Sequence, residues 1–224
     1  LGGDKSRPYR GLSRATAGVE AELQFRPSAG FGAPTIALFG HARTEEYESH
    51  LRDGRRYSLG ASVRAAATDR IGLFASVSHN RARAHAAVFD GSDNAFRAHA
   101  DYGLGASRSL YLALEHRRGD LVLAASPLAL VAAKHDDEPA YPGGGVGDDV
   151  FVAPLLVDYR VRGRTASAAI GCNFPVGPRD SIDLSWRHVR STPANAADLP
   201  AGLYEGGTPR YTVNQFLLVY LMSF

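Results

Sequence analysis

The sequence has almost no cysteine and no long apolar run. Cys172 is the single cysteine among 224 residues, so a fold held together by disulfides within the chain is excluded. No stretch of 18 or more uncharged apolar residues occurs, which excludes a transmembrane helix. The formal net charge is only +2, and no basic cluster is dense enough to indicate a nucleic-acid partner. Hydrophobic residues nevertheless make up 45% of the chain, so an intrinsically disordered chain is excluded too.

What the sequence does contain is a hydrophobic pattern that repeats every two residues. In residues 12–26, alternate positions are mostly apolar, and the positions between them are mostly polar, as at Glu20 and Glu22. Successive side chains of a β-strand point to opposite faces, so this pattern predicts a strand with one apolar and one polar face. The alternation recurs along the chain.

Two irregularities in the pattern carry further predictions. In residues 72–86 the apolar positions change parity, which predicts a β-bulge near His79. A strand running without a break through Ala106–Ser109 would point Arg108 toward lipid if the chain spans a membrane. That would cost roughly 2–4 kcal/mol at the bilayer centre, so we expect a turn there.

Nine strands follow from the pattern, and the connections between them alternate in length. The predicted strands are residues 12–26, 35–47, 56–67, 72–86, 95–105, 110–134, 150–174, 181–191 and 211–224. The compact connections are Pro27–Pro34, Thr68–Ile71, Ala106–Ser109 and Pro175–Asp180. The longer, more polar connections are Ser49–Arg55, Ala87–Asn94, Asp136–Asp149 and Thr192–Arg210. Short turns on one side and longer loops on the other are typical of outer-membrane barrels, whose short turns are periplasmic.

The last predicted strand ends in an aromatic residue, with apolar residues at every second position before it. These residues are Phe216, Leu218, Tyr220, Met222 and the final residue Phe224. The strand resembles the C-terminal strand of bacterial outer-membrane proteins, which ends in an aromatic residue, usually Phe. The resemblance implies a location in the outer membrane of a Gram-negative bacterium, contact with outer-membrane lipid and recognition by the barrel-insertion machinery.

The expected fold is all-β, an antiparallel up-and-down transmembrane β-barrel of about ten strands. Bacterial single-chain barrels have even strand counts, so nine predicted strands leave one unaccounted for. Either a strand precedes Leu1, or eight is the correct count, or the chain is part of a larger barrel. Residues 1–11 are expected to form a polar N-terminal segment and residues 12–224 the barrel, with an extended outer hairpin at about 117–160. A soluble β-sandwich or lipocalin-like barrel is the alternative, because its strands also alternate.

The polar faces of the predicted strands carry charges of both signs, which would lie inside such a barrel. The residues expected to line the lumen are Glu20, Glu22, Arg43, Arg64, Arg97, Asp101, Asp183 and Arg187. Charges that pair with one another would fill a narrow interior, whereas a water-filled channel would also be lined by charges. No cofactor is expected. No metal site is expected either, because no His, Cys and carboxylate spacing matches that of a zinc site.

The outer hairpin is apolar on both faces. Between Leu121 and Ala133 both sets of alternate positions are apolar, and the return segment Val150–Val157 is similar. A strand that is buried on both faces has such a continuous apolar run. We therefore expect Leu121–Val157 to pack against a partner protein, another subunit or the neighbouring loops of the same chain.

One motif resembles the active site of the outer-membrane lipid A deacylases. That family carries a His-x-Ser motif on its penultimate strand and a Glu in the following loop. Here His188, Ser191 and Glu205 lie at the corresponding positions. The chain departs from the family by one extra residue between His188 and Ser191, which places the two side chains on opposite faces of an extended strand.

The sequence therefore predicts a non-enzymatic, porin-like outer-membrane β-barrel. It would act as a pore or export component, as one subunit of a complex, or as a membrane anchor for a partner protein. A lipid-modifying hydrolase that uses His188, Ser191 and Glu205 is the alternative function. A soluble β-barrel that binds an apolar ligand is the second alternative.

Overall fold

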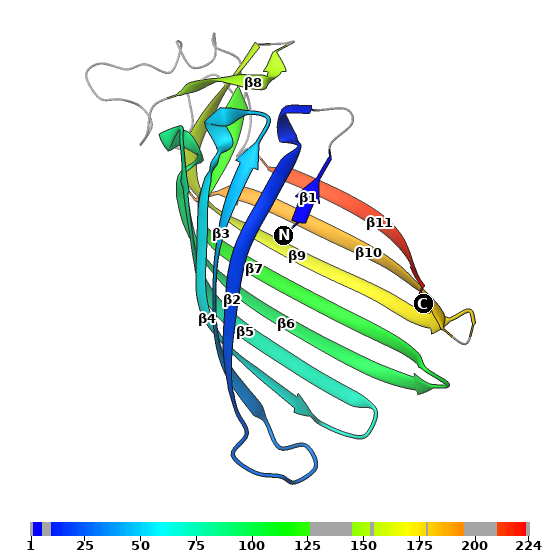
Figure 1. Cartoon of the computed structure of the whole chain (residues 1–224). Helices are drawn as coiled ribbons and strands as arrows, with labels where there is room; N and C mark the ends of the chain where they lie inside the picture. The colour runs from blue at the N-terminus through cyan, green and yellow to red at the C-terminus, as the bar shows by residue number, and fades with distance from the viewer. Residues whose placement is uncertain are drawn as a thin grey trace.

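The computed structural model describes residues 2–5, 10–125, 145–152, 155–177, 179–194 and 210–222. Its strands form a single antiparallel sheet (Figure 1). They are β1 (Gly2–Asp4), β2 (Arg14–Phe25), β3 (Thr35–Tyr47), β4 (Gly54–Ala66), β5 (Ile71–Ala84), β6 (Gly91–Gly105), β7 (Arg108–Ala125), β8 (Val146–Val152), β9 (Leu155–Pro175), β10 (Asp180–Pro193) and β11 (Tyr211–Met222). Three short 3-10 turns, η1 (Arg10–Leu12), η2 (His50–Arg52) and η3 (Ala87–Phe89), lie between them.

The sheet has the simple up-and-down order that the sequence predicts. Each long strand pairs with the next one along the chain, except that β7 pairs with β9, and β8 folds back onto β9 outside this path. Each of the nine predicted strands corresponds to one long strand of the structure. The short strands β1 and β8 were not predicted. The single strand expected over 150–174 is wrong at its start, because residues 150–152 belong to β8, which pairs antiparallel with β9. The end of the predicted strand 110–134 lies outside the described residues.

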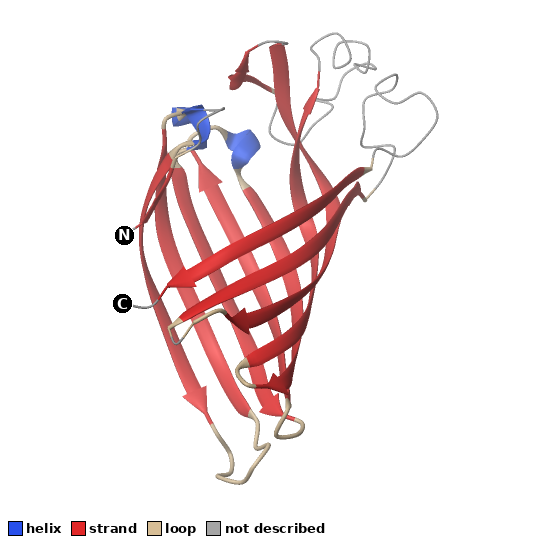
Figure 2. Ribbon diagram, turned by 90° about the vertical axis from the view of Figure 1, so that its right-hand side faces the viewer, coloured by secondary structure: helices blue, strands red, loops and turns tan. Residues whose placement is uncertain are grey.

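The sheet curves strongly around an interior space, as Figures 1 and 2 show from two sides. It is not closed, because neither β1 nor β2 pairs with β11 among the described residues. β1 covers only the start of the β2 edge, from Arg14 to Thr16. η1, η2, η3 and β8 lie at one end of the strands, which we call the outer end. The compact turns lie at the opposite end.

The expected bulge near His79 is wrong. The β4–β5 ladder runs without a register shift from Gly54↔Ala84 to Ala66↔Gly72, and the β5–β6 ladder is equally regular. Parity therefore stays constant along β5, so Leu73 and Val77 share a face with His79 and Arg81. In the sequence, the apolar positions of β5 change parity for a different reason. The face of Leu73 and Val77 becomes charged toward the outer end, while the opposite face carries the alanines Ala82 and Ala84 there.

The expected turn between β6 and β7 is confirmed. Gly105, Ala106 and Ser107 all have positive φ, at 85°, 49° and 58°, and β7 begins at Arg108. Two successive residues with positive φ match the backbone twist of a tight hairpin. The left-handed conformation is unfavourable for non-glycine residues, so Ala106 and Ser107 are strained.

The two faces of the sheet differ sharply in polarity. The face that carries Leu23, Leu59 and Phe216 is apolar, and these side chains are 71%, 70% and 84% exposed. Among the described residues the buried apolar side chains are only Ala37, Val88, Ala95, Tyr159 and Val161. In a β-sandwich, by contrast, the inner faces of two sheets pack their apolar side chains together. No helix in the described part of the chain is both long and apolar enough to cross a membrane.

Candidate functional site on the concave face

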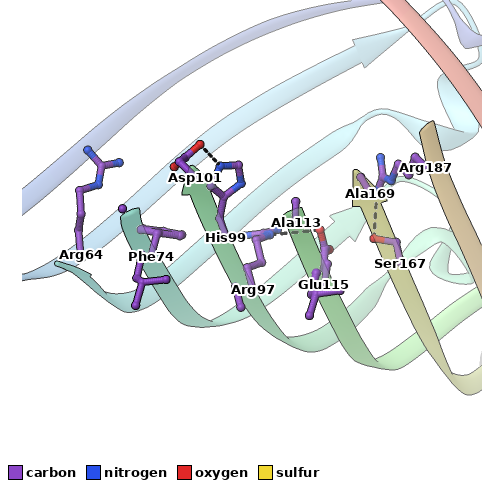
Figure 3. A pocket seen from close by; sticks show the side chains of 14 residues that line it. Arg64, Phe74, Arg97, His99, Asp101, Ala113, Glu115, Ser167, Ala169 and Arg187 are labelled. Atoms are coloured by element: carbon purple, nitrogen blue, oxygen red, sulfur yellow. Dashed lines mark hydrogen bonds and ion pairs between the residues drawn. The ribbon is translucent and has the colours of Figure 1, made fainter. Parts of the chain in front are cut away.

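The charged side of the sheet faces inward. Arg64 of β4, Arg97 of β6 and Arg187 of β10 line one cavity of about 730 Å³ (Figure 3). Side chains from strands so far apart in the sheet meet in one cavity because the sheet curves toward this face. We call it the concave face, and the apolar side the convex face.

The eight predicted lumen residues all fall on the concave face. Arg64, Arg97, Asp101 and Arg187 line the cavity in Figure 3. Arg43 lines a second cavity of about 650 Å³ nearer the outer end. The remaining residues are Glu20, Glu22 and Asp183, and they share this face by strand register and alternation. The structure thus brings the predicted set to one side of the sheet, while its role as a lumen remains a proposal.

Ion pairs neutralise part of this charge. Nε of Arg97 lies 3.3 Å from the Glu115 carboxylate, and Nη2 of Arg117 lies 2.6 Å from Asp93. The sequence did not single out Asp93 and Arg117 because Asp93 was placed in a loop, whereas β6 begins at Gly91. Opposite charges that face each other across two strands become visible only once the register is known.

An aromatic side chain links two further carboxylates across the concave face. Nε2 of His99 lies 2.8 Å from the Asp101 carboxylate, and the His99 ring stacks on Tyr111 with centroids 5.5 Å apart. The Tyr111 hydroxyl donates a hydrogen bond of 2.9 Å to Asp183 on β10. The Tyr111 ring lies against Gly171, where a Cβ would come within 2.4 Å of the ring. The glycine therefore makes room for the ring that connects β6, β7 and β10.

Two cations on the wall of the larger cavity form no ion pair with a carboxylate in the described part of the chain. Among the described residues Arg64 has no ion pair, and its guanidinium lies 5.8 Å from the Phe74 ring centroid. Nη2 of Arg187 donates a 3.5 Å hydrogen bond to the neutral Ser167 hydroxyl. The cavity therefore has an excess of positive charge along the part of its wall that these two arginines form.

Nearer the outer end, one buried carboxylate holds three arginines. Glu45 is only 2% exposed and lies 3.2 Å from Arg14 and 3.0 Å from Arg43. It also accepts a hydrogen bond from Arg56 on β4. Three adjacent strands are thereby fastened together by a single side chain.

The described part of the outer hairpin packs against the same chain. Asp149 lies 2.7 Å from the Ser49 hydroxyl and 2.9 Å from Arg52, and Arg52 also pairs with Asp158 at 3.2 Å. The Arg52 guanidinium lies 4.4 Å from the centroid of the Phe89 ring of η3. We expected Leu121–Val157 to pack against a partner protein, another subunit or neighbouring loops. In its described part, the contacts are with neighbouring loops of the same chain. Residues 126–144 and 153–154 lie outside the described part.

The hydrolase-like residues do not come together. Nδ1 of His188 lies 2.9 Å from the side-chain oxygen of Asn214, and the Ser191 hydroxyl lies 2.7 Å from Thr165. The β9–β10 and β10–β11 registers run without interruption past both residues, so they point to opposite faces, as their spacing predicts. Glu205 lies outside the described residues. A serine nucleophile needs its histidine within hydrogen-bond reach, and this pair does not meet that condition.

The terminal strand keeps the alternation expected of an insertion signature. Phe216, Leu218, Tyr220 and Met222 lie on the convex face with Leu184 and Trp186 of β10, and all four are exposed. Phe224 lies outside the described residues. Convex-face side chains from β7, β9, β10 and β11 form a shallow apolar groove that includes Cys172.

Within the described residues, no group of three His, Cys, Asp or Glu side chains is arranged to hold a metal ion. No protein-family model matches the sequence, and no curated protein matches it significantly. The protein is thus described by its fold alone. It is an open, curved, antiparallel all-β sheet with an apolar convex face and a charged concave face.

Proposed function

We propose that the protein is a non-enzymatic, integral outer-membrane β-barrel that lines a narrow, polar channel. The observation that carries the proposal is the distribution of the side chains. Large apolar residues are exposed on the convex face, while ion-paired arginines and carboxylates are gathered on the concave face. Hydrocarbon on the outside and water on the inside would stabilise this arrangement, which bulk water on both sides would not.

A channel is favoured over a completely filled interior because two cavities remain between the concave side chains. Their volumes are about 730 and 650 Å³, and both are lined by arginines. Arg64 and Arg187 contribute positive charge that no described carboxylate neutralises. The proposed channel therefore prefers small anions.

A membrane anchor for a partner protein is the second candidate, because β7 and β9 are too long for a membrane alone. They contain 18 and 21 residues, whereas crossing a bilayer takes about 9–11. Their outer ends would therefore extend beyond the proposed bilayer on that side. Deletion of Leu121–Val157 would release a bound partner if this candidate is correct. Assembly that the deletion leaves unchanged would remove it.

Membrane insertion is tested by the fluorescence of Trp186, the single tryptophan of the chain. This residue lies on the convex face and is 38% exposed. Brominated lipids in reconstituted vesicles should quench its emission strongly, and aqueous iodide should quench it weakly. The opposite order would overturn the membrane proposal.

Channel function is tested by single-channel recording in planar bilayers. The wild-type protein should conduct with a preference for chloride over potassium, and Arg64→Glu with Arg187→Glu should reverse that preference. Arg108→Glu is the matched control, because Arg108 is exposed at the start of β7 and lines neither cavity. A membrane-inserted protein without conductance would exclude the channel while leaving the anchor as the candidate.

A further inference from the structure

The convex face becomes strongly basic toward the outer end. We use the name outward arginines for the arginines of this region whose alternation places them on the convex face. They are Arg55 of β4, Arg81 and Arg83 of β5, Arg118 of β7, Arg162 and Arg164 of β9, and Arg190 of β10, and all seven are exposed. On β4, β5 and β10, the apolar residues of the convex face lie closer to the compact turns, whereas on β7 the apolar Val122 lies beyond Arg118 toward the outer end.

Like charges face each other directly within this group. Arg55 is the register partner of Arg83 across β4 and β5, and Arg118 is the register partner of Arg164 across β7 and β9. Directly opposed residues have Cβ atoms about 4.5–5.5 Å apart, and like charges at that separation destabilise a sheet. Each pair is therefore unfavourable unless an anion lies between or above the two guanidinium groups.

The described part of the protein does not supply such an anion. On the concave face, Glu45, Asp93 and Glu115 neutralise arginines, but no described carboxylate forms an ion pair with any outward arginine. Nε of Arg164 donates only to the neutral hydroxyl of Thr192, at 3.2 Å. Asp120, the cross-strand neighbour of Arg162, instead accepts a hydrogen bond from the backbone N–H of Ser92 at 2.8 Å.

An apolar groove begins directly beside one of these arginine pairs. It has a volume of about 690 Å³ and runs over the convex face between β3 and β7. Its apolar lining includes Leu59, Val77 and Phe96. By strand register, the row of its lining nearer the outer end is Leu59, His79, Asn94 and Arg118, and the next row includes Val77, Phe96 and His116. Asn94 is also the register partner of Arg118, so the groove leads to the Arg118–Arg164 pair.

We propose that the Arg118–Arg164 pair and this groove bind an anionic membrane lipid. The headgroup phosphate would accept charge-assisted hydrogen bonds from both guanidinium groups, whose planar donors match phosphate oxygens. An acyl chain would lie along Leu59, Val77 and Phe96. This inference rests on the proposed membrane location, and it names the lipid class that the outer end of the convex face recognises.

The test is native mass spectrometry of the purified full chain, released from neutral detergent and titrated with phosphatidylglycerol or phosphatidylcholine. The wild-type protein should retain phosphatidylglycerol preferentially. Arg118→Gln with Arg164→Gln should weaken that binding by about tenfold or more, because two charge-assisted hydrogen bonds are lost. The matched control is Arg70→Gln with Arg108→Gln, which removes two exposed arginines at the compact turns. It should leave the affinity for phosphatidylglycerol unchanged.

A stability measurement separates binding from simple repulsion. In neutral detergent without lipid, Arg118→Gln should raise the Tm, because it removes a like-charge contact. With phosphatidylglycerol present, the same substitution should lower the Tm relative to the wild-type protein. A Tm change of the same sign in both conditions would overturn the inference.

The outcomes distinguish this inference from the proposed function. If brominated lipids fail to quench Trp186, the membrane location fails and the lipid site fails with it. If quenching is strong but the two lipids bind equally, or the double substitution changes nothing, only the lipid site fails. Full displacement of phosphatidylglycerol by millimolar inorganic phosphate would mean a site for free phosphate, which also overturns the proposal.

Discussion

The Glu45 carboxylate on β3 lies 3.2 Å from Nη1 of Arg14 on β2, and it is the common counter-ion of three arginines. The carboxylate is 2% exposed, whereas the side chains of Arg14, Arg43 and Arg56 are 31%, 42% and 45% exposed. A single protected anion thus holds three partly hydrated cations from three neighbouring strands. Water can hydrate the partly exposed arginines if the ion pairs break, but it cannot reach the buried carboxylate. The carboxylate therefore depends on the arginines more than they depend on it.

Glu45→Gln should destabilise the protein by about 1–3 kcal/mol, measured as the free energy of unfolding in urea. The range is below that for a fully buried ion pair, because water screens the partly exposed arginines. Glu22→Gln on the exposed part of β2 is the control and should change stability by less than about 0.5 kcal/mol. Equal effects of the two substitutions would contradict the role assigned to Glu45.

Gly171→Ala should destabilise the protein by about 1–3 kcal/mol, because an added Cβ would lie 2.4 Å from the Tyr111 ring. Displacing that ring would also strain its hydrogen bond to Asp183. Gly72→Ala is the control, since its nearest non-neighbouring atom would lie at 3.8 Å. Combining Gly171→Ala with Tyr111→Ala should recover part of the loss. A Gly171→Ala protein as stable as Gly72→Ala would show that Tyr111 does not occupy this position.

Ser107→Gly should stabilise the protein by about 1 kcal/mol, because it relieves a non-glycine residue with a φ of 58°. Ser109→Gly is two residues further along, inside β7, where glycine should weaken the strand. The two substitutions are therefore expected to shift the Tm in opposite directions. Shifts of the same sign would mean that the turn at Ala106 and Ser107 is not as described.

The η2 loop should respond to pH through His50 and Asp53. A side-chain hydrogen bond to Asp53 raises the pKa of His50 above its ordinary value, and the charge of Asp53 acts in the same direction. Burial raises the pKa of Asp53, but hydrogen bonds from His50 and from the backbone N–H of Tyr47 outweigh burial and lower it overall.

The raised pKa of His50 determines the direction of the pH effect. Its contribution to loop stability is complete below the ordinary histidine pKa and is lost as pH rises through the raised value. An NMR titration of the His50 ring should give a midpoint above that of an unperturbed histidine, and Asp53→Asn should lower the midpoint. A His50 midpoint that Asp53→Asn leaves unchanged would exclude the pair.

The sequence predicted the nine long strands because period-two alternation is a local property of the chain. It also predicted which residues share the concave face, since the face of a side chain depends only on its parity within a strand. The error at β5 has the same origin. The outward face of that strand changes from Val77 to Arg81 without a bulge, and a pattern that follows only apolar residues registers this as a change of parity.

The contacts at the site could not be predicted in the same way, because they depend on register between strands. Arg117 meets Asp93 and Tyr111 meets Asp183 only because specific residues of neighbouring strands are aligned. β8 was also missed, and so were the ion pairs of Arg52 with Asp149 of β8 and Asp158 of β9, since they join residues about 100 positions apart. The sequence predicted that the outer hairpin packs against another part of the chain or a partner. It did not predict that η2 is the segment that the hairpin contacts, because η2 has no alternating pattern.

Among the described residues, β11 and the part of β2 beyond Thr16 each have one edge without a neighbouring strand, and these edges constrain what could complete the sheet. Both strands run from the outer end toward the compact turns, because an even number of reversals separates them along the sheet order. Joining them directly would create a parallel pair in an otherwise antiparallel sheet. Closure that keeps every neighbour antiparallel requires an odd number of intervening strands, and β1, running antiparallel to β2, already occupies the first of those places. The direction of any strand that fills the opening is thereby determined, whatever its sequence.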